Sequence, residues 1–475
     1  MPRLQQFVEC VGAALCEYAT AALARLVPFE TALLEVARAM HRHTAAILPP
    51  PDLRAALREV VSSPAETVEL AIQDGVAAIR PPVAEEFRDT LVTYLELLPE
   101  VVRQALRRPG DPDGVSVPEE FAIRRAEDWL LFLPDRLPTF HPGDLPPGLD
   151  NWRVENLRGL GPHAEVWDGY DDDQPDLSPA CLKFVTDPKA RNQFDKQVTM
   201  IRRVLDLDVV NGLIPLRSVY VLSSPPCLEY VHLPGYDLAN LMHDARWKGD
   251  RPRPDQAALL ARRAARIVGK LHRLNPPLVH RGLKPSNVLL SPTNEGRLSA
   301  WVSDSGWGQI TAALGADGLD VSQAIRRSLR GSYGPLYASP QQKAGGPPDP
   351  RDDVYAIGVI WYQLLMRDPT AKPPMSQGWA AEFRRHGLSD SLAGLISACL
   401  SEVPADRPGD GQALADLIAA NTTTPRNGDS ATFRLRGSTS HDLRKQREAE
   451  PDRDVELPRL RVKPRVAEEV DEDEE

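Results

Sequence analysis

The sequence predicts an α+β fold: an α-helical domain, then a part that begins with strands and ends with helices, then a disordered tail. Three observations support this. Apolar residues recur at spacings of three and four through residues 1–133, which is the period of amphipathic helices. Strand-like segments begin at Trp152, and an amphipathic helix is expected at 256–274. The segment 421–475 contains few large apolar residues, which is typical of disorder.

The first domain, 1–133, reads as a helical bundle. Prolines punctuate it, and several stand at helix starts, where a missing N–H costs nothing. After an initial helical pattern, further helices are predicted at 29–48, 52–61, 64–80, 83–108 and 118–133. This domain presents no recognisable catalytic site, and its role as an interaction module or as a packing appendage stays open.

Composition limits the function classes. The chain has 475 residues, of which 42% are apolar, enough for the cores of two or three domains. Segment 134–151 is rich in proline and predicts a stiff, polar linker that forms no core. The net charge of −11 owes much to the end of the tail, where seven of the residues 468–475 are acidic. Because no part of the chain is strongly basic, nucleic-acid binding is not expected.

The sequence predicts a cytoplasmic protein. Its N-terminus lacks the basic region and apolar core of a signal peptide, and no uncharged stretch of 18 residues could span a membrane. The five cysteines are scattered and form no C-x-x-C pair, so buried, reduced thiols are expected.

The stretch 279–290 reads V-H-R-G-L-K-P-S-N-V-L-L. It resembles the catalytic loop of protein kinases, H-R-D-L-K-P-x-N, at every marked position but one. The resemblance implies that Asn287 binds metal and that Lys284 contacts phosphate. Gly282 stands where those enzymes carry the aspartate that acts as catalytic base, so the same loop that indicates the fold argues against the usual chemistry.

Upstream of this loop, two further segments resemble kinase motifs. Residues 157–167 are similar to the glycine-rich loop, with Gly159 and Gly161 approaching the ATP phosphates and Val166 covering the adenine. Ala164 replaces the third glycine of that motif, and a proline at 162 removes a backbone donor. Residues 180–184, A-C-L-K-F, are similar to the strand whose lysine, here Lys183, holds the α- and β-phosphates.

The nucleotide site implied by the resemblance is completed by two more segments. Residues 226–231 resemble the hinge, in which Glu229 and Val231 present backbone groups to adenine. Residues 302–306 resemble the D-F-G motif, with Asp304 as a second Mg²⁺ ligand. In that motif Ser305 replaces the phenylalanine. A helix is also expected at 193–201, between the strand of Lys183 and the hinge. In that helix Gln197 falls at the position of the glutamate that, in the family, pairs with the lysine.

Later signatures follow in the same order as in the family. Residues 337–341 resemble the end of the activation loop, with Gln341 in place of its glutamate. Asp353 matches the buried aspartate that anchors the catalytic loop. Arg407 matches the arginine that normally pairs with the activation-loop glutamate, so a hydrogen bond to Gln341 is expected instead of a salt bridge.

Together these segments resemble a bacterial-type serine/threonine protein kinase over 152–420, with a small antiparallel β N-lobe at 152–231 and a helical C-lobe at 232–420. The resemblance implies ATP and Mg²⁺ as cofactors and a protein partner or substrate of unknown identity. Because the residues that hold nucleotide are kept and those that serve catalysis are replaced, the preferred interpretation is a pseudokinase. The alternatives are a slow serine/threonine kinase and a small-molecule phosphotransferase.

Overall fold

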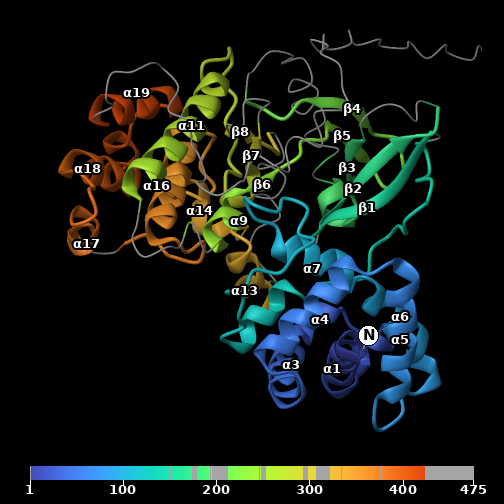
Figure 1. Cartoon of the computed structure of the whole chain (residues 1–475). Coiled ribbons are helices and arrows are strands. Elements are labelled where there is room, and N and C mark those ends of the chain that lie inside the picture. Colours follow the sequence, from blue (N-terminus) through green and yellow to red (C-terminus); the bar gives the residue numbers. More distant parts are fainter. Residues whose placement is uncertain are drawn as a thin grey trace, which may run out of the picture. The chain divides into compact units, whose positions relative to one another are not determined.

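The computed structural model describes most of the chain before residue 423 (Figure 1). The described residues are 2–149, 151–161, 163–173, 179–192, 194, 212–244, 247, 253–292, 298–305, 321–332, 334–374 and 377–422. All of them fall within one compact unit, Met1–Arg434. The predicted disordered tail beyond Thr422 lies outside the described residues and stays a prediction.

The N-terminal part is helical, as predicted, and is coloured in blue tones in Figure 1. Its helix α1 contacts α3, α4 and α5 and supplies buried side chains such as Phe7, Val11 and Leu15 to a shared core. The helices and 3-10 turns are α1 (Pro2–Tyr18), α2 (Thr20–Leu23), η1 (Phe29–Thr31), α3 (Leu33–Ile47), α4 (Pro50–Ser62), α5 (Ala65–Ala78), α6 (Glu85–Glu96), α7 (Leu98–Leu106) and η2 (Ala126–Leu131).

Two of the predicted helices differ from the structure. The run 83–108 divides at Leu97 into α6 and α7, because Pro99 has no N–H to continue the helical ladder. The run 118–133 forms no α-helix and contains only the 3-10 turn η2. Its apolar residues Phe121 and Ile123 are two positions apart, and both contact the helical core from an irregular segment.

A five-stranded antiparallel sheet follows, which confirms the small β N-lobe. Its order is β1-β2-β3-β5-β4. Lys183 lies on the central strand β3, opposite Val166 of β2 and Leu228 of β5. The strands are β1 (Trp152–Leu160), β2 (Ala164–Asp171), β3 (Ala180–Val185), β4 (Leu216–Tyr220) and β5 (Cys227–Val231).

The proline-rich segment before the sheet contributes to a core, contrary to the prediction. Phe140 and Leu149 are buried in the apolar cluster of β1, β2 and β3. The ring of Phe140 lies 4.7 Å from that of Phe184, centroid to centroid. The backbone of the segment also pairs with β1, since the N–H of Gly143 donates to Val154 and the N–H of Val154 donates to Asp144. The two apolar side chains therefore outweigh the polar composition that suggested a free linker.

The C-terminal part is mainly helical and includes a small sheet in the order β6-β7-β8. Its strands are β6 (Tyr236–Asp237), β7 (Val288–Pro292) and β8 (Leu298–Val302). Its helices and 3-10 turns are α9 (Leu238–His243), α11 (Pro254–His272), η3 (Pro285–Asn287), α13 (Val321–Leu329), α14 (Gly334–Tyr337), α15 (Pro340–Lys343), α16 (Pro350–Met366), η4 (Gln377–Trp379), α17 (Ala380–Arg384), α18 (Asp390–Cys399), η5 (Pro404–Asp406) and α19 (Gly411–Asn421).

Helix α16 is the centre of this part. Nearly all of its side chains are buried, and it contacts α11, α18 and α19. Helices α11 and α19 approach closely because glycines stand at their contact. A Cβ added to Gly269 would lie 2.4 Å from the backbone N of Gln412, a separation that only glycine allows. The mixed α and β composition and the antiparallel sheet fit the kinase-like fold that the sequence predicts.

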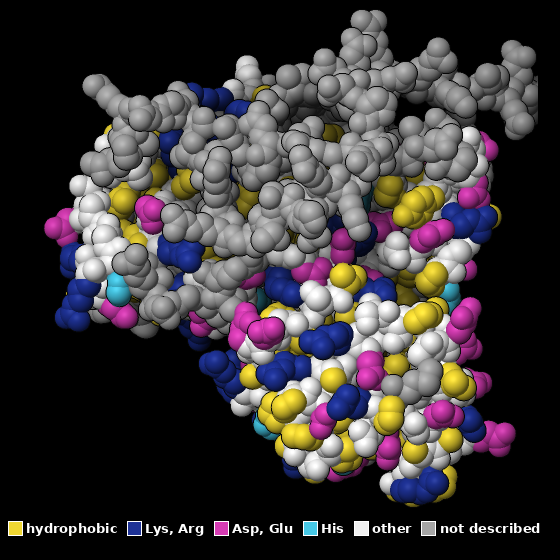
Figure 2. Space-filling model, in the orientation of Figure 1, with side chains coloured by type: hydrophobic (Ala, Val, Ile, Leu, Met, Phe, Trp, Pro, Cys, Tyr) yellow, Lys and Arg dark blue, Asp and Glu magenta, His cyan; other side chains and the backbone are white. Residues whose placement is uncertain are grey.

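On the face shown in Figure 2, hydrophobic side chains of the helical part are scattered among charged ones. Most of the exposed apolar residues are far apart along the chain, as with Leu26, Leu70 and Val115, although Leu26 and Val27 are adjacent. Such scattering is ordinary for a protein surface. No helix within the described ranges combines the length and the apolar character needed to cross a bilayer.

The buried linker gives a first prediction. Replacing Phe140, which is 6% exposed, with alanine leaves a cavity against Phe184 and should lower the free energy of unfolding by about 3 kcal/mol. Urea denaturation measures this difference. The control is Leu145→Ala in the same segment, where the side chain is 50% exposed and a change within about 0.5 kcal/mol is expected. Equal effects of the two substitutions would contradict the packing described here.

Candidate functional site

The backbone of the loop 280–282 is held by a buried carboxylate at the start of α16. Asp353 is fully buried, and its two oxygens accept hydrogen bonds from the N–H groups of His280 (2.7 Å) and Arg281 (2.8 Å). The Nε2 of His272 donates to the same carboxylate at 2.9 Å. Burial alone would raise the pKa of Asp353, but the bond from His272 and its neighbours holds that pKa below its ordinary value. The expected anchor is confirmed.

Gly282 sits in a well-defined backbone position. Its N–H donates to Nδ1 of His280 at 3.2 Å, and its carbonyl accepts from the amide of Asn287 at 3.1 Å. Gly282 does not have the positive φ that glycine adopts more readily than other residues. These hydrogen bonds hold the backbone at Gly282, and the residue itself supplies no side-chain carboxylate.

Lys183 and Asp304 form a close ion pair across the site. The Nζ of Lys183 lies 2.7 Å from Oδ1 of Asp304, and both side chains are mostly buried. Asp304 follows β8 and has a left-handed backbone, with φ of 61°. Burial alone would raise the pKa of Asp304, but the ammonium group of Lys183 beside it keeps the pKa below its ordinary value. The carboxylate is therefore ionised at neutral pH.

Asn287 and Asp304 lie beside the ends of the neighbouring strands β7 and β8. Asn287 ends the turn before β7, Asp304 follows β8, and the N–H of Ser303 donates to the carbonyl of Asn287 at 2.9 Å. Amide and carboxylate oxygens are suitable ligands for Mg²⁺. Within the described residues, no group of three or more His, Cys, Asp or Glu side chains could hold a metal ion. A cation at this pair would need further oxygen ligands, such as those of phosphates.

The loop between β1 and β2 closes one side of the site. The N–H of Gly161 donates to the carbonyl of Ala164 at 3.0 Å, which makes a tight turn. Gly159 and Gly161 have no positive φ, and an added Cβ would meet its nearest atoms only at 3.5 Å. Glycine is therefore not required at these two positions by backbone strain or by a close contact. Its effect is to leave the wall of the site free of side chains. The proline at 162 lies outside the described residues.

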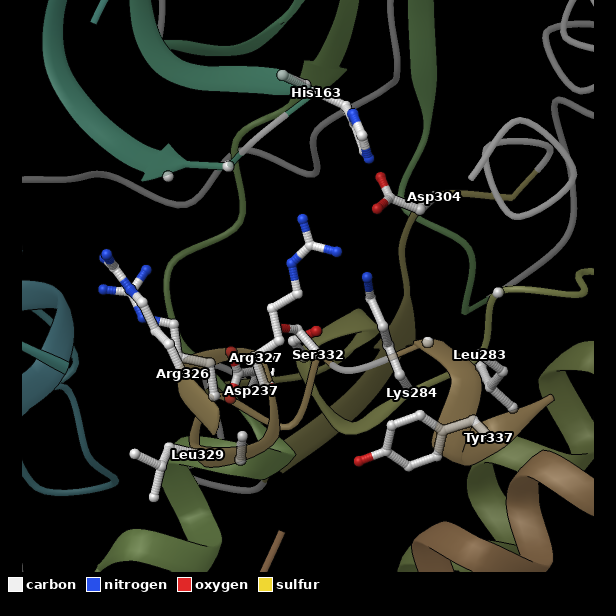
Figure 3. A pocket seen from close by; sticks show the side chains of 18 of the residues that line it. His163, Asp237, Leu283, Lys284, Asp304, Arg326, Arg327, Leu329, Ser332 and Tyr337 are labelled. Atoms are coloured by element: carbon white, nitrogen blue, oxygen red, sulfur yellow. Dashed lines mark hydrogen bonds between the residues drawn. The ribbon is translucent and has the colours of Figure 1, made fainter. Parts of the chain in front are cut away.

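A cavity of about 720 Å³ connects these elements, a volume suitable for a nucleotide-sized ligand (Figure 3). It brings together most of the residues that the sequence singled out. Those that line it are Gly159, Gly161, Val166, Lys183, Gly282, Lys284 and Asp304. Asn287, Glu229 and Val231 do not line it.

The predicted hinge is part of the sheet. The N–H of Val231 donates to the carbonyl of Pro215 at 3.0 Å, so this donor is already used and would have to leave the sheet to reach an adenine. The side chain of Glu229 is buried and accepts a hydrogen bond from the hydroxyl of Tyr220 at 2.8 Å. A contact of the remaining backbone groups with adenine stays a prediction.

The cavity also contains further charged residues beside Lys284, and the sequence analysis did not identify one of them, Arg327. The side chains of Lys284 and Arg327 extend toward the region of Asp304 and His163 (Figure 3). Burial, with Lys183 and Arg327 close by, lowers the pKa of Lys284 to about 8. His163 is bound through Nδ1 to Asp187 at 2.6 Å. Arg327 stands on α13, in a segment that matches no motif, so no pattern in the sequence pointed to it.

Asp237 is a second missed residue. It lines the cavity, caps α9 by accepting from the N–H of Asn240 at 2.8 Å, and burial raises its pKa to about 6. Its spacing to Asn240 forms a capping box, a signal that could have located it in the sequence.

Three residues differ from the kinase motifs that they otherwise resemble: Gln341, Ser305 and Gln197. Arg407 donates to Oε1 of Gln341 at 2.8 Å, so the expected hydrogen bond in place of a salt bridge is confirmed. Ser305 is buried, and its hydroxyl has no hydrogen-bond partner among the described residues, a cost of about 1–3 kcal/mol. Gln197 lies outside the described residues, so its pairing with Lys183 stays a prediction.

Comparison with known proteins agrees with this geometry. Serine/threonine-protein kinase pkn3 of Myxococcus xanthus is 31% identical over 195 residues, which cover 38% of this chain and 34% of that protein. Serine/threonine-protein kinase PkaA of Streptomyces coelicolor is 31% identical over 165 residues, covering 33% of this chain and 27% of that protein. The chain is related to protein kinases.

A plant protein shows the same relationship over a longer stretch. Receptor-like kinase LIP2 of Arabidopsis thaliana is 25% identical over 303 residues, covering 57% of this chain and 50% of that protein. The chain thus spans between about a quarter and a half of the length of these curated relatives. No known family model matches the chain. Over the matched stretches the chain is similar to bacterial and plant protein kinases.

The lowered pKa of Lys284 predicts a pH dependence. Its pKa in the folded state is about 8, below the ordinary 10.5, so between these values the unfolded chain binds more protons and stability rises with pH. Relative to Lys284→Met, the wild type should therefore gain about 1–2 kcal/mol between pH 7.5 and pH 9.5.

Urea unfolding at the two pH values measures this gain. The control is Lys372→Met, at an exposed position on the surface, which should follow the wild type at both values. A difference between wild type and Lys284→Met that stays constant with pH would contradict the burial assigned to this ammonium group.

Proposed function

We propose that this protein is an ATP-binding pseudokinase that acts in signalling through its conformation and through a protein partner. The observation that carries the proposal is the position of Gly282, whose backbone is held in place while the side chain of a general base is missing. A positioned general base contributes about 10²–10⁴-fold to a reaction rate. Its absence removes proton acceptance from the substrate hydroxyl and leaves the fold intact.

No other carboxylate lining the described cavity is poised to replace that base. Each one is engaged in an ion pair or in hydrogen bonds that support the structure. They are Asp135 with Arg326, Asp237 with the N–H of Asn240, Asp304 with Lys183, Asp352 with the hydroxyl of Ser339, and Asp353 with His280 and Arg281. These contacts give each carboxylate a structural role, so the proposal assigns none of them the role of the missing base.

The proposal that the site holds ATP with Mg²⁺ rests on what is retained. Lys183 and Lys284 would contact phosphates, and Asn287 with Asp304 would provide oxygen ligands to the cation. When bound, Mg²⁺ would neutralise phosphate charge. The amide nitrogen of Asn287 is used by Gly282, which leaves the amide oxygen as the ligand atom. Gly159 and Gly161 keep the wall beside the phosphates free of side chains.

A weakly active serine/threonine kinase is the second candidate. The observation in its favour is the pairing of Lys183 with Asp304, which keeps the carboxylate of Asp304 ionised and holds both side chains at the proposed phosphate region. Charge stabilisation by lysine and metal could support slow transfer if a phosphate oxygen accepted the proton. Turnover that Lys183→Met abolishes would favour this candidate over a pseudokinase.

Nucleotide binding tests the proposal. ATP with Mg²⁺ at about 100 times its dissociation constant should add roughly 2.7 kcal/mol of stability, visible as a raised melting temperature. Asp304→Asn keeps the size of the side chain but loses the charge that holds the cation, so its shift should be smaller. The control is Asp390→Asn on the exposed face of α18. Equal shifts in wild type and Asp304→Asn would show that the assigned site does not hold the nucleotide.

A further inference from the structure

Residues 131–139, here called the strap, join the helical part to the sheet. The strap begins at the end of η2 and is fastened to α6 by the hydroxyl of Tyr94, which donates to the carbonyl of Pro134 at 2.9 Å. Adjacent residues of the strap reach two different walls of the cavity, the helix α13 and the β1–β2 loop.

The first wall is α13. The buried guanidinium of Arg326 forms an ion pair with Asp135 of the strap, and Arg330 donates to the carbonyl of Leu131 at 3.2 Å. Ile325 also contacts the apolar core of the helical part. Arg326 is only 2% exposed, so without Asp135 it would be a buried charge lacking its carboxylate partner, which is strongly unfavourable.

The second wall is the β1–β2 loop. Arg136, the residue after Asp135, donates to the carbonyl of Gly161 at 3.0 Å and to the carboxylate of Glu165 at 2.6 Å. The N–H and hydroxyl of Thr139 donate to the same carboxylate oxygen at 2.6 and 2.7 Å. Glu165 is fully buried, so these bonds fix the strap to the base of the glycine-containing loop.

Under the proposed function an acceptor hydroxyl would enter the cavity beside Gly282, and this side is here called the acceptor side. Residues Arg327 and Leu329 of α13 line the cavity together with Gly282 and Lys284 (Figure 3). From the C-terminal part, Nε2 of His243 lies 2.6 Å from the carbonyl of Leu329. Helix α13 is thus held between the strap and α9 while its residues line the same cavity as Gly282.

We infer that the helical part is an intramolecular regulator of this site, with the strap as the element that couples α13 to the β1–β2 loop. A partner that moved the helical part would pull on Asp135 and Arg136 together. That movement would release α13 from the acceptor side and free the loop over the phosphates. The inference deepens the proposed function, because its effect on nucleotide rests on that function, whereas the coupling between strap and walls does not.

Hydrogen exchange on the full chain tests the coupling without nucleotide. Asp135→Asn removes the charge that pairs with Arg326, so amides of 324–332 should exchange about tenfold faster or more, since local opening becomes easier. Because the strap also loses its fixed position, residues 158–161 and 164–166 should exchange faster as well. Asp390→Asn, in an exposed pair distant in sequence, should change neither segment.

A second variant separates coupling from misfolding. In Asp135→Asn with Arg326→Met the buried charge is gone, so exchange of 324–332 should return toward the wild-type rate. Arg136→Gln should loosen the β1–β2 loop and, through the strap, also speed exchange of 324–332. Unchanged exchange of 324–332 in both Asp135→Asn and Arg136→Gln would overturn the inference.

Nucleotide affinity distinguishes the inference from the proposed function. If ATP with Mg²⁺ binds the wild type, Asp135→Asn and Arg136→Gln should each change the dissociation constant of ATP at least threefold. This is roughly the effect of losing one exposed ion pair. Binding that neither variant alters would contradict the regulatory role. If the wild type binds no nucleotide, the proposed function fails, and the exchange experiment alone decides whether the strap couples the two walls.

Discussion

The site depends on the hydrogen bonds that Asp353 accepts from the backbone of His280 and Arg281. They tie the loop that carries Gly282 to α16, the most deeply buried helix of the C-terminal part. His272 extends this connection, because its Nε2 donates to Asp353 while its Nδ1 accepts from the N–H of Gly411 at 3.0 Å. One buried carboxylate thereby links the loop to α11, α16 and α19. Removing a buried charge partner of this kind typically costs about 3–5 kcal/mol.

This anchor explains how the fold persists while the reactive group is absent. The loop conformation is set by backbone N–H groups and by His280, none of which requires a carboxylate at 282. The charges of Lys183, Lys284 and Asp304 remain assembled at the cavity. The buried hydroxyl of Ser305 has no partner among the described residues, which is a local weakness beside Asp304. The conformation of the loop therefore does not depend on a carboxylate at position 282.

The sequence predicted the parts of the structure that are defined by local pattern. A helical N-terminal part is predicted by periodicity, although the run 118–133 forms no α-helix, and a small antiparallel sheet around Lys183 and the anchor Asp353 are implied by the motifs. Composition misled for the proline-rich linker, because two apolar side chains, Phe140 and Leu149, suffice to dock it on the sheet. The role of Val231 in the sheet depends on which strand pairs with it, which no single segment specifies.

Long-range contacts account for what could not be predicted at the site. Arg326 and Arg327 lie in a segment with no motif, and their positions depend on a helical part more than 180 residues earlier in the chain. The lowered pKa of Lys284 likewise arises from burial and from neighbours brought together only by folding. A sequence can indicate which residues are available for chemistry, whereas the tertiary structure decides which charges share a cavity.

The most direct measurement is transfer of the γ-phosphate of ATP to a generic protein acceptor by wild type, Lys183→Met and Gly282→Asp. If Gly282 leaves the site without a working general base, phosphate transfer by the wild type should not exceed transfer by Lys183→Met. Gly282→Asp should then gain activity, though less than the roughly 10²–10⁴-fold of a full general base, because Gln197 and Ser305 remain. Wild-type turnover near the roughly 1 per second of ordinary kinases, abolished by Lys183→Met, would contradict the account.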